Sequence, residues 1–231
     1  MRKFLILAGL MIVLVAGCEF GLVERYRYKL IVDVEVDDQI KSGASVIQVV
    51  HRPDIVPGRP LKHQSTFSGQ AVFVDLGSRG NLIATLEPRN SFSPAYFPMA
   101  AFFRYPASAS ADEQKERFAQ LKALSIRRAK SALPSEHIPL LVTFRTLHEP
   151  KSVEQVDPAA LETTFGPGVR LKAVWIEMTD APVTDDLARK LPWLTDIAAK
   201  KVALDGEAAS LHPRTLASRL SAGSFQFLGF R

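Results

Sequence analysis

Cys18 is the residue with the most distinctive chemistry, because it is the only cysteine in the chain. It lies in the stretch Leu14–Phe20 (LVAGCEF), directly after an apolar run and directly before the first acidic residue, Glu19. A thiol in this place can pack in a core, act as a nucleophile or accept a covalent lipid. The residues on its N-terminal side discriminate between these uses.

The N-terminal segment has the organisation of a secretory signal. Arg2 and Lys3 form a positively charged start, and the fourteen residues 4–17 are uncharged and largely apolar. As a helix, such a run spans roughly 20 Å at about 1.5 Å per residue, which is short of the ~30 Å hydrocarbon core of a bilayer. The segment is therefore typical of a signal-peptide h-region rather than of a stable transmembrane helix.

The residues Val15-Ala16-Gly17-Cys18 resemble the lipobox of bacterial lipoproteins, in which a pair of small residues precedes an invariant cysteine. The resemblance implies diacylglyceryl transfer to the Cys18 sulfur, cleavage after Gly17 and, often, acylation of the new amino group. Two or three acyl chains anchor a protein stably, whereas one binds marginally. This interpretation predicts a signal peptide over 1–17, a lipidated N-terminus with a short linker over 18–24, and a single folded domain over 25–231.

Two alternatives remain open at this point. The first is an uncleaved signal anchor extended through Val23, and the second is a plain signal peptide in which Cys18 is incidental. All three interpretations place the folded part outside the cytoplasm, because Arg2 and Lys3 hold the N-terminus inside. We expect a protein of the cell envelope, lipid-anchored and facing the periplasm, with the choice between inner and outer membrane open. A lone cysteine also excludes an internal disulfide.

Catalytic and metal-binding signatures are weak elsewhere. No G-x-S-x-G motif occurs, although a Ser–His–Asp set assembled only in space leaves no such pattern. The histidines lack the spacing of ligand pairs on a helix; they are His51, His63, His137, His148 and His212. We expect no metal and no cofactor, and we favour a protein without catalysis of its own.

Acidic residues have structural explanations as well. Asp37-Asp38 and Asp185-Asp186 are expected to serve a hairpin turn and a helix start. Glu177 and Asp180 lie on an apolar stretch, where a charge needs a partner. An ion pair with a basic residue of the same stretch, Arg170 or Lys172, is the favoured explanation.

An aromatic segment at 90–106 is the candidate for a partner-binding surface. Its prolines exclude a long regular helix, and its rings cannot all point inward from a proline-broken loop, so some are expected to form an exposed apolar patch for an envelope protein or the lipid surface. The patch comprises Tyr96, Phe97, Phe102, Phe103 and Tyr105. The alternative is a loop folded over a sheet face.

The charge of the mature chain argues against nucleic acid as a partner. Removal of Arg2 and Lys3 leaves 27 basic and 24 acidic residues. This small excess, with no long basic run, is too weak to indicate nucleic-acid binding. It is compatible with mild attraction to an anionic lipid surface.

The elements that must position these residues are mostly strands. Residues 25–36 alternate apolar and charged side chains, which predicts a strand, and 44–51 should return as the second strand of a hairpin. Residues 52–69 are expected to form a loop. Further strands are predicted at 70–76, 81–88, 139–147, 169–180 and 224–230.

The best helix is predicted over 110–133, with a capping box at Ser110 and an end at Pro134. Short helices are expected from Asp157, within 182–194 and at 214–220. The pattern predicts an α+β fold, a mostly antiparallel sheet with one long helix and a few short ones.

A wider resemblance covers most of the mature chain. It rests on Glu149–Val153, Val156–Pro158, Phe165–Lys172, Ile176–Thr184 and Leu191–Leu194. These pieces resemble a group of uncharacterised proteobacterial exported proteins and lipoproteins. The resemblance implies a recurring domain and brings no activity or catalytic residue with it.

The sequence therefore predicts a membrane-tethered extracytoplasmic protein that binds partners or has a structural role in the cell envelope. The alternative is an envelope hydrolase with a non-sequential acid/base site. Convergent polar side chains in a closed pocket would favour the hydrolase, and an exposed aromatic patch without a pocket would favour binding.

Overall fold

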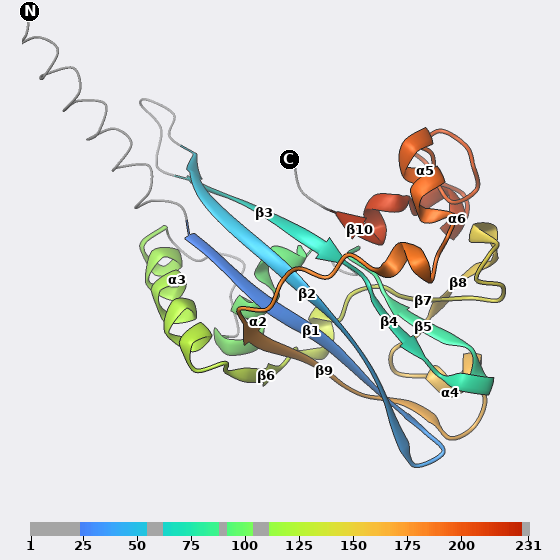
Figure 1. Ribbon diagram of the computed structural model, residues 1–231, viewed down its shortest axis with the longest axis horizontal. Coiled ribbons are helices and arrows are strands. Elements are labelled where there is room, and N and C mark those ends of the chain that lie inside the picture. The colour runs from blue at the N-terminus through green and yellow to red at the C-terminus, as the bar shows by residue number, and fades with distance from the viewer. Residues whose placement is uncertain (1–23, 55–61, 88–91, 104–110, 228–231) are drawn as a thin grey trace, which may run out of the picture.

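The computed structural model describes residues 24–54, 62–87, 92–103 and 111–227, which form two antiparallel sheets and several short helices (Figure 1). The larger sheet has six strands in the order β10 (Gln226–Phe227), β3 (Lys62–Gln70), β2 (Gln39–Asp54), β1 (Glu24–Val36), β9 (Val169–Thr179) and β6 (Lys130–Ala132). The smaller sheet has four strands in the order β4 (Val72–Asp75), β5 (Asn81–Ala84), β7 (Leu141–Phe144) and β8 (Val153–Val156). The predicted α+β class with antiparallel pairing is confirmed.

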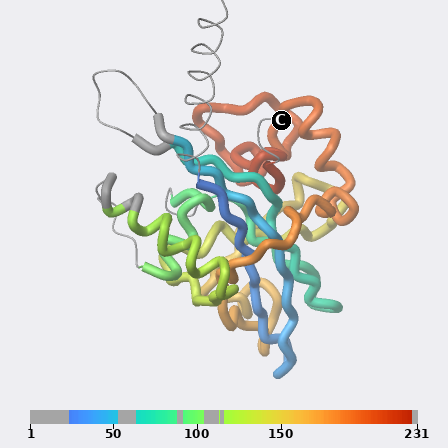
Figure 2. The backbone as a smooth tube through the Cα atoms, turned by 60° about the vertical axis from the view of Figure 1, so that its left-hand side comes forward, coloured from blue at the N-terminus to red at the C-terminus, as the bar shows by residue number. Residues whose placement is uncertain are grey.

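The helices are short and lie outside the two sheets. They are α2 (Phe97–Phe103), α3 (Ala111–Ile126), α4 (Leu161–Phe165), α5 (Leu194–Lys200) and α6 (Leu216–Arg219). Figure 2 shows α2 and α3 on one side of the long β1–β2 hairpin and the C-terminal helices on the other. No helix within the described ranges is long and apolar enough to cross a membrane.

The β1–β2 hairpin forms as its alternating sequence predicts. Along β1 every second side chain is buried, namely Tyr26, Tyr28, Leu30, Val32, Val34 and Val36. Val36 pairs with Gln39, so the turn contains only Asp37 and Asp38, whose φ angles are 48° and 65°. Two positive φ angles match the right-handed twist of the strands. Strand β2 is longer than predicted and runs to Asp54.

The predicted loop over 52–69 is wrong for its second half, which forms β3. Strand β3 pairs with β2 from Gln48↔Ser68 to Asp54↔Lys62. Its sequence, KHQSTFSGQ, is polar because β3 lies near the sheet margin, next to the two-residue β10. Hydrophobic periodicity does not reveal such a strand, since strand formation depends strongly on context.

The two sheets share one chain segment and pack closely. Ala71 alone separates β3 in the larger sheet from β4 in the smaller one. Where β2 approaches β4, Gly43 lies so close that a Cβ atom there would overlap the backbone carbonyl of Phe73. Glycine is thus required here because a side chain would not fit; its backbone conformation does not require it, since its φ is not positive.

The smaller sheet separates two hydrophobic cores, so β5 and β7 are buried on both faces. The first core joins one face of this sheet to the buried face of β1 and to α2 and α3. The second core joins the other face to the C-terminal segment, where Trp193 and Phe225 pack against Phe144.

The long predicted helix ends seven residues early. Helix α3 stops at Ile126, Arg128 has a left-handed φ of 48°, and β6 then pairs with β9. Pairing along the free edge of β9 therefore outweighs helix propensity over 130–132. The predicted capping box at Ser110 lies outside the described residues.

The segment 180–186 crosses the outer face of the larger sheet (Figure 1). Thr184 lies in the range 182–194, where a short helix is predicted, but it bonds to β2 instead of starting a helix. Its N–H donates to the carbonyl of Val46 at 3.3 Å, and its Oγ1 accepts from the N–H of Val46 at 2.9 Å. Residues Leu187–Arg189 form only a 3₁₀ turn. The predicted helix at 214–220 is confirmed as α6, with Thr215 as its N-cap.

Candidate functional site

The predicted aromatic surface is mostly packed against the core. Phe97 is fully buried, so the expectation that it lies on an exposed patch is corrected. Tyr96, Phe102 and Phe103 are half-buried and contact the first core. Tyr105, like Cys18, lies outside the described residues. The segment is held against the sheet because the carbonyl groups of Pro94 and Ala95 accept hydrogen bonds from tyrosines of β1.

A chain of polar side chains lies beneath this segment. The Tyr26 hydroxyl donates to the carbonyl of Ala95 at 3.0 Å and is 3.0 Å from Nε2 of His51. Nδ1 of His51 is 2.6 Å from Oγ of Ser65, which is 2.9 Å from the hydroxyl of Tyr96. Four side chains from β1, β2, β3 and the turn before α2 are thereby joined.

The hydrogen-bond directions follow from the acceptors. A carbonyl only accepts, so the Tyr26 proton points to Ala95 and the Tyr26 oxygen accepts from Nε2–H of His51. Ser65 Oγ donates its single proton to the Tyr96 hydroxyl, so that proton is not available to Nδ1 of His51. Ser65 and His51 are therefore in contact, but the serine proton does not point to the histidine as it would toward a general base.

The surroundings of His51 are aromatic and dry. His51 is fully buried, and its ring lies 4.0 Å from that of Phe118 between centroids. Burial also raises the pKa of Tyr26 and Tyr28 well above their usual range, so both phenols stay protonated. The sequence gives no sign that His51 belongs to a network, since its partners lie 14 to 67 positions away along the chain.

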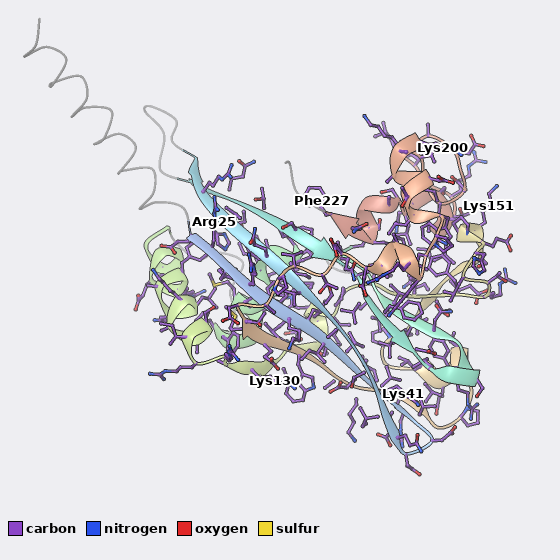
Figure 3. All side chains as sticks on the ribbon, viewed as in Figure 1. Arg25, Lys41, Lys130, Lys151, Lys200 and Phe227 are labelled. Carbon is purple, nitrogen blue, oxygen red and sulfur yellow. The ribbon has the colours of Figure 1, made fainter. Side chains whose placement is uncertain are left out.

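An open hollow of about 370 Å³ lies at the start of β1, next to Tyr26. It is lined by Arg25, Tyr26, Arg27, Gln48, Ser125, Thr179 and Asp180. Figure 3 labels Arg25 at the start of β1, beside α3. The hollow is a wide surface depression and does not enclose a ligand on all sides.

The charge of the hollow is dominated by arginines. Arg27 is fixed by its Nε, which donates to Gln48 at 3.0 Å, and by its Nη1, which donates to the carbonyls of Asp180 and Ala181. The Asp180 carboxylate is neutralised by Arg128 at 3.4 Å. Positive charge is therefore in excess, and the chemistry that the hollow offers is the binding of an anion.

A second hollow, of about 390 Å³, lies between α4 and the start of β9. Its walls are mainly apolar residues of 158–161 and 169–171, with Glu162 and Arg170 as the charged members. Its two charged residues have opposite signs, so it lacks the excess of positive charge found in the arginine hollow.

The other acidic residues serve the fold. Asp37 pairs with Arg79 at 3.1 Å, and Asp186 accepts from Gln70 at 2.7 Å. Glu177 pairs across strands with Lys29 at 3.1 Å, so the expected pairing with Arg170 or Lys172 is wrong.

Those two cations instead flank Glu35, and the hydrogen bond from Lys172 is the largest of the contacts that lower the pKa of Glu35. Among the described residues, no three His, Cys, Asp or Glu side chains gather as a metal site.

Comparison of the chain with known protein families, with curated proteins and with solved structures finds no match.

Proposed function

We propose that this protein is a membrane-tethered extracytoplasmic lipoprotein, anchored through acyl chains on Cys18 and acting as a binding component of the cell envelope. The basic start, the short apolar run and the small residues before Cys18 support the anchor. The arginine-lined hollow supports the binding role, because its open, positively charged surface suits an anionic partner.

The observation that carries this proposal is the closeness of the hollow to the anchor. Strand β1 begins at Glu24, six residues after Cys18. Six residues span at most about 20 Å, so the anchor would hold the hollow near the membrane surface. Tethering raises the effective concentration of the domain toward anything else at that surface.

A Cys18→Ser variant tests the anchor. We expect the wild-type chain to fractionate with membranes, to incorporate a fatty-acid analogue and to begin at residue 18. The variant should lose the label and the N-terminus at residue 18. If the wild-type chain carries no label and the variant still fractionates with membranes, the N-terminal segment is an uncleaved signal anchor. A soluble, unlabelled wild type would show a plain signal peptide.

The hydrolase alternative is favoured by one observation, the 2.6 Å contact between Ser65 Oγ and His51 Nδ1. Against it, the partner that orients His51 is the phenol of Tyr26 rather than a carboxylate, and the ring is fully buried. The network fits a structural role, since it fixes the segment before α2 to three strands.

A serine-directed fluorophosphonate probe separates the two roles. We expect no labelling of the wild-type protein. Labelling that Ser65→Ala abolishes, and that Ser68→Ala on the same strand leaves unchanged, would establish the hydrolase instead.

A further inference from the structure

The hollow exists because two neighbouring strands end at different places. Strand β9 ends at Thr179, opposite Arg27, whereas β1 continues to Glu24 and there pairs only with β2. The last turn of α3 supplies the facing wall through Ser125. The result is an open trough along one edge of β1, lined by side chains of both β1 and α3.

Two guanidinium groups in this trough have unused hydrogen-bonding capacity. Nη2 of Arg27 donates to none of the described residues, while its Nε and Nη1 are held in place by the three bonds given above. Arg25 is exposed, and within the described ranges it makes no ion pair or hydrogen bond. A fixed guanidinium beside an unpaired one is suited to the oxygens of a phosphate group.

The end of α3 adds an apolar side chain to this charged surface. Ile126 is 81% exposed, one of three large apolar side chains that are exposed in the described part of the chain, and it directly follows Ser125 of the trough. Arg127 and Arg128 come next and are both exposed. An exposed aliphatic group on a surface with an excess of positive charge is the combination that binds at the headgroup level of a membrane.

We propose that this end of the domain docks onto anionic phospholipid, with a headgroup phosphate in the Arg25–Arg27 trough and Ile126 inserted among the headgroups. The inference rests on the proposed membrane attachment. It commits to lipid as the occupant because the trough is positively charged and because β1 begins six residues from the predicted anchor.

A single spin label on the full-length chain tests the docking. The chain has one native cysteine, so an Ile126→Cys variant carries one additional thiol, and the unsubstituted chain reports whether Cys18 is blocked. Leu211→Cys is the matched control, since Leu211 is 95% exposed and lies in the segment between α5 and α6. These two helices lie on the other side of the molecule from the start of β1 (Figure 1).

The labelled protein is reconstituted in vesicles of phosphatidylcholine with or without phosphatidylglycerol. We expect the label at 126 to become shielded from a water-soluble relaxation agent only when phosphatidylglycerol is present. The label at 211 should remain accessible in both. Equal accessibility at the two positions in both vesicle types would overturn the proposal.

Substitutions of arginine identify the trough. Arg25→Gln should weaken the shielded state about fivefold, the effect typical of removing one cation near an anionic surface, and adding Arg27→Gln should weaken it further. Arg214→Gln removes the same charge from an exposed position after α5 and should change nothing. Equal effects of Arg25→Gln and Arg214→Gln would reduce the interaction to net charge alone and contradict a specific trough.

The outcome is separable from that of the anchor. Absence of fatty-acid labelling in the wild-type chain contradicts the Cys18 proposal but leaves the accessibility measurement valid for a chain retained by its N-terminal segment. Inorganic phosphate tests whether the trough binds a soluble anion instead of a lipid headgroup. Binding of free phosphate that Arg25→Gln abolishes, without shielding at 126, would assign the trough to a soluble anion and overturn the lipid proposal.

Discussion

The guanidinium of Arg79 lies 3.1 Å from the carboxylate of Asp37, and this contact ties the tip of the β1–β2 hairpin to the turn between β4 and β5. Arg79 also donates to the carbonyl of Phe165 at 3.3 Å. The N–H of Asp37 donates to the carbonyl of Gly168 at 3.1 Å. The Gly-Pro-Gly turn at 166–168 therefore fits between two hairpin turns that are far apart in the sequence.

Gly168→Ala should destabilise the fold more than a positive φ alone explains. Gly168 has a φ of 83°, and a Cβ there would lie 2.7 Å from Oδ1 of Asp37. Gly206 has a φ of 85° and no atom within 4 Å of such a Cβ, so Gly206→Ala isolates the backbone strain. We expect about 1 kcal/mol for Gly206→Ala and about 1 kcal/mol more for Gly168→Ala in urea unfolding. Equal losses of unfolding free energy in the two variants would show that the Asp37 side chain moves aside without cost.

Gly43→Ala should disturb the contact between the two sheets. The added Cβ would overlap the carbonyl of Phe73, which belongs to the backbone of β4 and cannot rotate away. We expect a loss of about 2–3 kcal/mol in the free energy of unfolding. Gly223→Ala is the control, because its Cβ would be 3.6 Å from the nearest atom and its φ is ordinary. Its effect should stay within about 0.5 kcal/mol, and a similar value for Gly43→Ala would contradict the close approach of β2 and β4.

The parts of the fold that follow local patterns are the parts that the sequence predicts. The alternation along 26–36 places the right side chains in the core, and Asp37-Asp38 marks the hairpin turn. Strand β3 is invisible to the same reasoning, because a polar strand held between β2 and β10 has no hydrophobic period. The early end of α3 is likewise decided by a distant partner, β9.

Of the candidate site, the sequence predicts only the charged residues. The alternation along the first strand places Arg25 and Arg27 on its outward face, but the trough between them and Ser125 depends on where β9 ends. The contact of His51 with Ser65 joins β2 to β3, and β3 was expected to be a loop. The aromatic segment at 92–103 looked exposed because the hydrogen bonds that hold it down come from distant tyrosines.

Tyr26→Phe should cost more stability than Tyr28→Phe. Both phenols are buried and donate to neighbouring carbonyls, of Ala95 at 3.0 Å and Pro94 at 2.7 Å. Only the Tyr26 oxygen also accepts from His51, so its loss leaves two buried groups without that partner. We expect about 1 kcal/mol for Tyr28→Phe and about 2–3 kcal/mol for Tyr26→Phe in chemical denaturation. The reverse order would contradict the assigned network.

The contact of Gln70 with Asp186 should make stability depend on acid pH. Gln70 is buried; its Oε1 accepts from the N–H of Leu187 at 2.8 Å, and its Nε2 donates to Asp186 at 2.7 Å. This hydrogen bond is the main cause that lowers the pKa of Asp186, with burial partly opposing it. The folded protein therefore favours the ionised carboxylate. The resulting stability is present above the unfolded pKa of about 4 and is lost as the pH falls through the lower folded value.

Asp186→Asn tests this dependence, because its amide oxygen can still accept from Gln70 but carries no charge. The Asp186 side chain is 39% exposed, so solvent screening should hold the difference in unfolding free energy at pH 6–7 below about 1 kcal/mol. The difference between wild type and variant should shrink toward zero near pH 2–3. Asp185→Asn is the control, because it changes the neighbouring carboxylate, which is exposed and lacks the Gln70 contact. Parallel pH profiles for the two variants in urea titrations would exclude a special role for Asp186.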